Sequence, residues 1–272
     1  MSLILSFNSG KFGSYLKRFK YNFFQRIYSA PSKQQLHFLI DGLKPLRTNF
    51  DLIRLGGDLD GGYLIPDDLE GITACFSAGV GPSSSFEKDC ADRGMKIFMA
   101  DASVEAPAIT DQRFYFIKKF IGLKNKGDYI TIKKWLDMTE MRKENELLLQ
   151  MDIEGNEYSI IGNIDPALLE KFRIIVIEVH RLGAMGFSYF YQQNKRMFDN
   201  LKIHHQCVHI HPNNCCGSRT VKGVEIPVAA EFTFLRKDRI SKTEPIDSLP
   251  HPMDRKNIAR KDELELSSIW YR

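Results

Sequence analysis

Three pairs of polar side chains stand at the ends of apolar runs in this sequence, and the members of each pair are two residues apart. Side chains with this spacing in a strand point to the same face, and a buried carboxylate without a partner is very costly. We therefore expect the pairs to line one polar pocket that can move a proton or bind a cation. The pairs are Asp152 with Glu154 after LLLQM, Glu178 with His180 in IIVIEVH, and His209 with His211 in CVHIH.

Two kinds of chemistry suit these residues. His180 is the predicted general base, with Asp152 or Glu178 orienting its ring and stabilising the imidazolium. The alternative is a divalent metal bound by Asp152 with His180, His209 or His211, for which oxygen ligands favour Mg²⁺ or Mn²⁺. A purely structural role for the pair His209 and His211 also stays open.

A glycine-containing turn and an acid indicate a nucleoside-type cofactor. In SAGVGPSSSFE, Gly79 and Gly81 permit a tight turn, and Ser83 or Ser84 could cap the following helix. Asp101 ends the next predicted strand, 22 residues after Gly79. An acid at that separation is placed to accept the hydroxyls of a ribose.

The identity of the cofactor follows from what the turn lacks. A dinucleotide fingerprint requires a third glycine, but Ser84 occupies that position. A pyrophosphate is therefore less well served than S-adenosylmethionine, which needs the turn, the ribose acid and a slot for adenine. The alternative cofactor is NAD, in an oxidoreductase or epimerase.

Other polar residues are candidates for contact with an acceptor. Asp60 and Tyr63 belong to the glycine-rich, acidic stretch GGDLDGGY, which could close over the cofactor or the acceptor. Asn213 and Asn214 follow the last histidine pair and could bind acceptor hydroxyls or simply form a turn. Glu154 completes this predicted substrate-binding set.

Strands alternate with helices from residue 72 onward, which predicts an α/β fold with a doubly wound, mostly parallel sheet. The segments HHQCVHIH and VAAEFTFLRK are joined without room for a full crossover helix, so we expect a C-terminal antiparallel hairpin. Glu157 opens a helix, where an acid suits the helix dipole. We expect a helical extension over residues 1–50, one domain over 51–240 and a tail over 241–272 that wraps the domain.

Composition and charge exclude several classes of protein. The 272 residues are 43% hydrophobic and 26% charged, and no apolar run reaches the length of a membrane span. The net charge of +4 is concentrated in residues 1–30, which alone carry +5, so the remainder stands at −1 and nucleic acid is not an expected partner. The five cysteines are odd in number and lack CxxC spacing, which favours a reduced, cytoplasmic protein.

Residues 11–28 place aromatic and aliphatic side chains at helical spacing with basic residues between them. One interpretation is an interfacial helix that contacts an anionic membrane, which would place the protein at the inner face of that membrane. The other is a basic helix that packs on the domain. A non-catalytic, membrane-associated scaffold is a further functional alternative that this segment keeps open.

The motifs resemble those of the FkbM-type S-adenosylmethionine-dependent methyltransferases. LLLQMDIEGNE is similar to the K-I-D-x-E-G-x-E signature of that family, with Gln150 in place of the usual lysine. FSAGVGPSSSFE resembles the glycine-rich first motif, with Ser77 in place of the usual acid. ITIKKWLDM, IHPNN and IPVAAEFTFLRK resemble later segments, so the resemblance runs from about Leu55 to about Arg239.

The resemblance implies a class I methyltransferase fold, which is Rossmann-like with a seven-stranded sheet, and methylation of a hydroxyl, often on a sugar or a polyketide. Our functional hypothesis is that the acceptor hydroxyl belongs to a sugar, glycan or glycolipid precursor. The resemblance also implies that Asp152 lies beside the reacting centre. The expected cofactor-binding set is Gly79, Gly81, Ser83, Asp101, Ala102 and Asp152.

Overall fold

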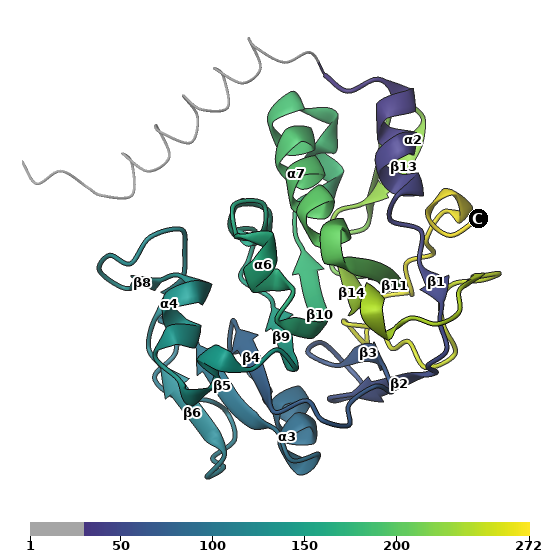
Figure 1. Cartoon of the computed structure of the whole chain (residues 1–272). Coiled ribbons are helices and arrows are strands. Elements are labelled where there is room, and N and C mark those ends of the chain that lie inside the picture. The colour runs from purple at the N-terminus through teal and green to yellow at the C-terminus, as the bar shows by residue number, and fades with distance from the viewer. Residues whose placement is uncertain (1–29) are drawn as a thin grey trace, which may run out of the picture.

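The computed structural model describes residues 30–272, so the predicted helix over residues 11–28 lies outside the described part of the chain. The centre of the described structure is a seven-stranded sheet with the order β11-β14-β10-β9-β4-β5-β6 (Figure 1). All neighbours in this sheet are parallel except β14, which is antiparallel to both β10 and β11. The strands are β4 (Ala74–Ala78), β5 (Lys96–Ala100), β6 (Phe114–Ile117), β9 (Leu147–Met151), β10 (Phe172–Val179), β11 (His205–Pro212) and β14 (Ala230–Arg236).

Alternate side chains of the central strands feed two separate apolar cores, because the sheet is covered on both faces. Phe76 and Leu149 belong to the first core, and Cys75 and Leu148 to the second. Such strands are apolar throughout rather than alternating with polar residues. The helices that contribute to the first core are α2 (Lys33–Asp41), α4 (Ile132–Asp137), α5 (Glu157–Ile161), α6 (Pro166–Leu169) and α7 (Ser188–His204). The second core contains α3 (Ser85–Asp92) and the hairpin of β2 (Leu52–Leu55) and β3 (Tyr63–Pro66).

The expected mixed α/β architecture, with a seven-stranded and mostly parallel sheet, is present and fits a Rossmann-like methyltransferase. The C-terminal hairpin is found in part. β11 and β14 are antiparallel neighbours, but the chain between them forms a second hairpin from β12 (Ser218–Val221) and β13 (Val224–Pro227). This small hairpin extends the connection without adding a strand to the main sheet.

The remaining elements are short and lie at the periphery. β1 (Leu46–Arg47) pairs with β15 (Glu244–Pro245), and β7 (Phe120–Ile121) pairs with β8 (Tyr129–Ile130). The short helices η1 (Glu140–Lys143), η2 (Leu182–Gly186), η3 (Lys237–Arg239) and η4 (Ser268–Trp270) complete the set. Residues 241–272 are called the C-terminal segment below. Trp270 of this segment is fully buried in the same core as α2, so the segment packs on the domain. Within residues 30–272, none of the helices has the length and apolar character needed to cross a membrane.

The topology fixes where a ligand would bind. The chain runs from β4 to β5 and β6 on one side of the sheet, and from β9 to β10 on the other. Strand order therefore reverses between β4 and β9, and ligands of such sheets bind outside the carboxyl ends of the strands at this switch point. Ala78 pairs with both Ala100 and Met151, so the residues that follow these three strands lie at one edge.

Candidate functional site

Gly79 is required by the backbone of the neighbouring strand. Its φ is +89°, and a Cβ atom built on it would lie 1.7 Å from the carbonyl oxygen of Asp152. The Asp152 amide donates a hydrogen bond of 2.9 Å to the carbonyl of Ala78, which draws the two strand ends together. Any side chain at position 79 would push β4 and β9 apart where the sheet opens.

A cavity of about 300 Å³ lies at these strand ends. Four predicted site residues line it, namely Gly79, Asp101, Asp152 and Glu154. The rest of the lining was not anticipated from the sequence and consists of Ala100, Ser103, Phe120, Ile121, Tyr129, Ile153 and Asn156. A cavity of about 450 Å³ between α4 and α6 is larger, but it holds none of the predicted site residues.

Asp101 is held firmly at the mouth of β5. Its Oδ2 accepts a hydrogen bond from the Val80 amide at 2.9 Å, and its Oδ1 accepts from the amide and the hydroxyl of Ser103 at 2.6 and 2.7 Å. A carboxylate has about four acceptor positions, so Asp101 keeps capacity for a ligand hydroxyl.

Three of the expected cofactor residues, Gly81, Ser83 and Ala102, do not line the cavity. Ala102 stands between the lining residues Asp101 and Ser103, whereas Gly81 and Ser83 follow Gly79 by two and four residues. The hydroxyl of Ser83 instead lies 3.0 Å from the hydroxyl of Ser85 and accepts a hydrogen bond from the Ser85 amide at 3.3 Å.

The two departures from the family motif, Ser77 and Gln150, contact each other. The Ser77 hydroxyl lies 2.6 Å from Glu87 Oε1 and 2.9 Å from Gln150 Oε1. Gln150 in turn donates to the hydroxyl of Tyr63 at 3.3 Å, so Tyr63 belongs to this buried network. Burial raises the pKa of Glu87, and a protonated Glu87 would supply the second proton that one hydroxyl cannot give to two acceptors.

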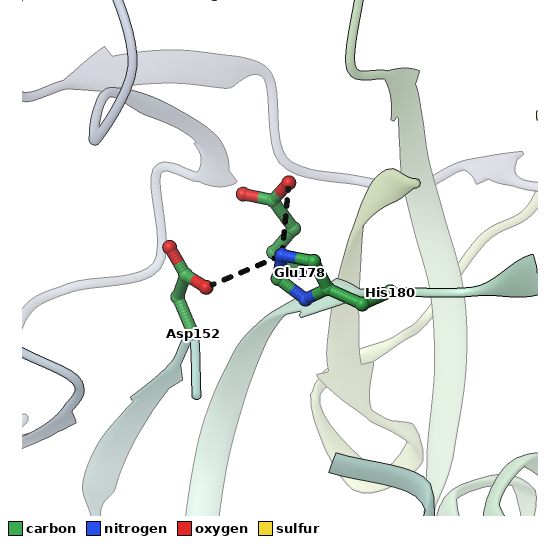
Figure 2. A group of neighbouring side chains, drawn as sticks. All are labelled: Asp152, Glu178 and His180. Carbon is green, nitrogen blue, oxygen red and sulfur yellow. Dashed lines mark ion pairs between the residues drawn. The ribbon is translucent and has the colours of Figure 1, made fainter. Parts of the chain in front are cut away.

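His180 lies among the carboxylates of Asp152, Glu154, Glu157 and Glu178, and this group is called the His180 centre below. Figure 2 shows the imidazole between Asp152, which follows β9, and Glu178 of β10. His180 Nε2 lies 3.9 Å from Asp152 Oδ1, 3.8 Å from Glu178 Oε1 and 3.6 Å from Glu154 Oε2. Its Nδ1 lies 3.1 Å from Oε1 of Glu157. The structure therefore brings together two of the three polar pairs expected from the sequence.

Glu157 orients the imidazole, a role that the sequence analysis did not assign. This fully buried carboxylate accepts hydrogen bonds from the amides of Ile153 at 3.1 Å and Gly155 at 2.9 Å. The same oxygen contacts His180 Nδ1, which directs Nε2 toward the other acids. Glu157 thus fixes both the turn after β9 and the ring that faces it.

The acids and the imidazole change one another's proton affinity. Burial raises the pKa of Asp152 to about 7, against the lowering effect of the His180 charge. Burial also raises the pKa of Glu178, and the nearby charge of Asp152 adds to this effect. Burial lowers the pKa of His180, but Glu157, Glu178 and Asp152 outweigh it and raise this pKa to about 9. At neutral pH the imidazole is therefore charged, while Asp152 is divided between its protonated and ionised forms.

Among the described residues, two groups of side chains are arranged so that they could hold a metal ion. One consists of Asp152, Glu178 and His180, and the other of Asp60, Glu178 and Glu231. In each group the candidate ligand atoms lie within 4.8 Å of one another. Asp152 Oδ1 is a buried atom without a hydrogen-bond partner, which suits a role as a ligand or a proton acceptor.

The third predicted pair lies with other carboxylates. His209 Nε2 is 2.8 Å from Oδ1 of Asp254. His211 lies between two acids, with Nδ1 3.2 Å from Glu231 Oε2 and Nε2 3.0 Å from Glu263 Oε1. Neither histidine belongs to a metal-ligand group in residues 30–272. Their contacts instead attach the C-terminal segment to the end of β11.

The two asparagines have different surroundings. Asn213 donates a hydrogen bond of 2.8 Å to Glu178 Oε1, so it belongs to the wall of the site. Asn214 accepts from the amide of Ile258 at 2.8 Å and donates to its carbonyl at 3.0 Å. Asn214 therefore binds the C-terminal segment.

Comparison with known proteins supports the resemblance inferred from the motifs. Residues 128–207 match the family model described as the Methyltransferase FkbM domain. The matched region contains Asp152, Glu157, Glu178 and His180 but ends before the tail and begins after the glycine turn. This match supports a methyltransferase.

Other comparisons add little. No curated protein matches the chain. A solved structure described as "Putative hemolysin from Streptococcus thermophilus" is similar, with 11% sequence identity and a TM-score of 0.36. The similarity covers 73% of this chain and 64% of that one.

Proposed function

We propose that this protein is an S-adenosylmethionine-dependent O-methyltransferase that acts on a hydroxyl of a sugar, glycan or glycolipid precursor. The single observation that carries the proposal is the cavity at the switch point. Asp101 and Asp152 both line this cavity, and Asp152 also belongs to the His180 centre. The match to the FkbM domain supports methyltransferase activity.

The cavity lining fits the proposed cofactor. Asp101 offers carboxylate oxygens to ribose hydroxyls, and the rings of Phe120 and Tyr129, with centroids 5.6 Å apart, offer an apolar surface for adenine. Gly79 leaves the strand ends open between them. When bound, S-adenosylmethionine supplies a methyl group activated on a sulfonium.

The residues of the centre assist attack by the acceptor oxygen. The new oxygen–carbon bond forms as the carbon–sulfur bond breaks, and the hydroxyl proton must go to a base. Near neutral pH Asp152 is the better proton acceptor, because His180 is already charged. Before the transfer the charged His180 stabilises the Asp152 carboxylate, and Glu157 holds the ring in place. The roles of base and orienting group are thereby exchanged relative to the assignment from sequence.

A divalent metal is the alternative means of activating the hydroxyl. Asp152, Glu178 and His180 would hold it, with Mg²⁺ or Mn²⁺ favoured by the two carboxylates. Such an ion would lower the pKa of the acceptor hydroxyl.

We also propose that residues 11–28 contact an anionic membrane, where a glycolipid precursor would be found. This part of the proposal rests on the spacing of basic and aromatic residues in the sequence.

Methyl transfer from isotopically labelled S-adenosylmethionine to a panel of glycans and glycolipid precursors tests the proposed activity. Asp152→Asn should abolish transfer to any acceptor that the native protein methylates, while the fold is retained. Its matched control is Asp165→Asn, which alters the N-cap of α6 and does not line the cavity. Normal turnover by Asp152→Asn would remove Asp152 from the site.

A further inference from the structure

The glycine-rich loop over residues 56–62 contacts the C-terminal segment through two matching pairs. Arg255 Nε lies 3.7 Å from Oδ1 of Asp58, and Asn257 Nδ2 lies 3.3 Å from Oδ1 of Asp60. In the loop and in the C-terminal segment alike, the residue of the second pair comes two positions after the residue of the first pair. The exposed ion pair contributes little stability, so the contact between Asn257 and Asp60 carries the connection.

Asn257 separates carboxylates that would otherwise repel one another. Its side-chain nitrogen donates to Glu231 Oε1 at 2.6 Å as well as to Asp60 Oδ1. Carboxylate oxygens of Asp60, Glu178 and Glu231 lie within 4.8 Å of one another. Like charges at this distance are destabilising unless donors or protons intervene. The amide provides two donors at one point, and with 6% of its surface exposed it is shielded from competing water.

The C-terminal segment has its own anchors on both sides of Asn257. Asp254 pairs with His209 at 2.8 Å, Ile258 bonds to Asn214, and Glu263 pairs with His211 at 3.0 Å. These contacts attach the backbone on both sides of Asn257 to β11 and to Asn214, which follows that strand. The position of Asn257 therefore does not depend on the loop.

The loop is anchored differently along its length. The Gly56 amide donates to Asp89 at 2.8 Å and the Gly57 amide to the Ser85 hydroxyl at 2.9 Å, which ties the first residues to α3. Arg54 donates to the carbonyl oxygens of Gly57 and Leu59. The side chain of Asp60, by contrast, contacts the C-terminal segment.

We infer that Asn257 is a positioning residue that holds Asp60 beside Glu178, so that the C-terminal segment completes the acceptor side of the site. The inference rests on the proposed function, because Glu178 contacts the His180 centre. Three carboxyl groups gathered in this way offer mainly hydrogen-bond acceptors, which suits an acceptor with several hydroxyl groups, such as a sugar.

Amide hydrogen exchange tests this inference in the full chain without knowledge of the acceptor. The buried amide of Gly62 donates to the carbonyl of Leu59 and reports closure of the loop. Loss of hydrogen bonds to charged groups in Asn257→Ala should speed exchange of Gly62 by about tenfold or more. The Gly57 amide, bonded to α3, should keep its protection. Asn257→Ser, which retains a donor, should fall between native and Asn257→Ala, and Arg260→Ala serves as the control from the same segment.

A double variant separates positioning by charge from simple packing. Asp60→Asn combined with Asn257→Ala removes the repulsion as well as the donor, so exchange at Gly62 should return toward the native rate. Unchanged exchange in Asn257→Ala, or no recovery in the double variant, would overturn the inference. Titration of the native chain with S-adenosylhomocysteine is the parallel measurement: absence of binding there contradicts the proposed function and leaves the exchange result readable.

Discussion

Replacement of Glu157 by glutamine should lower the pKa of His180 while preserving the shape of the site. Glutamine keeps an oxygen for the amides of Ile153 and Gly155, so the turn after β9 should persist. What is lost is the negative charge 3.1 Å from Nδ1 of the imidazole.

The magnitude follows from the strength of a hydrogen bond between charged partners. Such bonds contribute about 1.5–3 kcal/mol, and one pKa unit corresponds to about 1.4 kcal/mol. The pKa of His180, raised to about 9 in the native protein, should fall by roughly one to two units in the variant.

The same change alters the pH dependence of stability. A histidine whose pKa is raised on folding adds stability that is fully present below its unfolded value, about 6.5, and is lost as the pH rises through the folded value. For His180 the loss should extend to about pH 9. Urea unfolding should therefore show Glu157→Gln to be less stable than the native protein at pH 6, with the difference narrowing by pH 10.

The assay is an NMR titration of the His180 ring carbon in native protein, Glu157→Gln and Glu154→Gln. The last is the matched control, because Glu154 is 88% exposed and its charge is screened by solvent. A native His180 that titrates near 6.5, or an equal shift in both variants, would refute the assigned role of Glu157.

Two further predictions concern the glycine turn and the N-terminal segment. Gly79→Ala should destabilise the protein by at least about 2–3 kcal/mol, because the new Cβ meets the Asp152 carbonyl in addition to the strain of a positive φ; Gly94→Ala, with φ +90° and open space around it, should cost only about 1 kcal/mol. Thermal unfolding measures both, and equal losses would contradict the close approach of the strands. Deletion of residues 1–30 should abolish sedimentation with anionic vesicles, and unchanged or absent vesicle binding by the full chain would exclude the membrane contact.

Periodicity predicted the sheet because its strands are short apolar runs punctuated by turns. The runs ending at Ala78, Ala100 and Met151 became adjacent strands, and adjacency at one edge placed Asp101 near Asp152. Glu178, near the end of β10, and His180, directly after that strand, lie close to Asp152 because β9 and β10 are parallel neighbours.

Contacts between distant segments could not be obtained in this way. His209 and His211 have the same spacing as the other pairs, but their partners Asp254 and Glu263 come from a tail without periodicity. Phe120 and Tyr129 are residue types common in any strand, so the sequence does not mark them as site residues. The pairing of β7 with β8 places both in the lining of the cavity. The role of Glu157 depends on a turn whose geometry no local pattern specifies.

Calorimetric titration with S-adenosylhomocysteine tests the central claim most directly, with NAD⁺ as the parallel ligand. The account predicts micromolar binding of S-adenosylhomocysteine, none of NAD⁺, and loss of binding in Asp101→Ala, because Asp101 is the lining carboxylate proposed to accept the ribose hydroxyls. Failure of the native protein to bind S-adenosylhomocysteine, or equal affinity in Asp101→Ala, would contradict it.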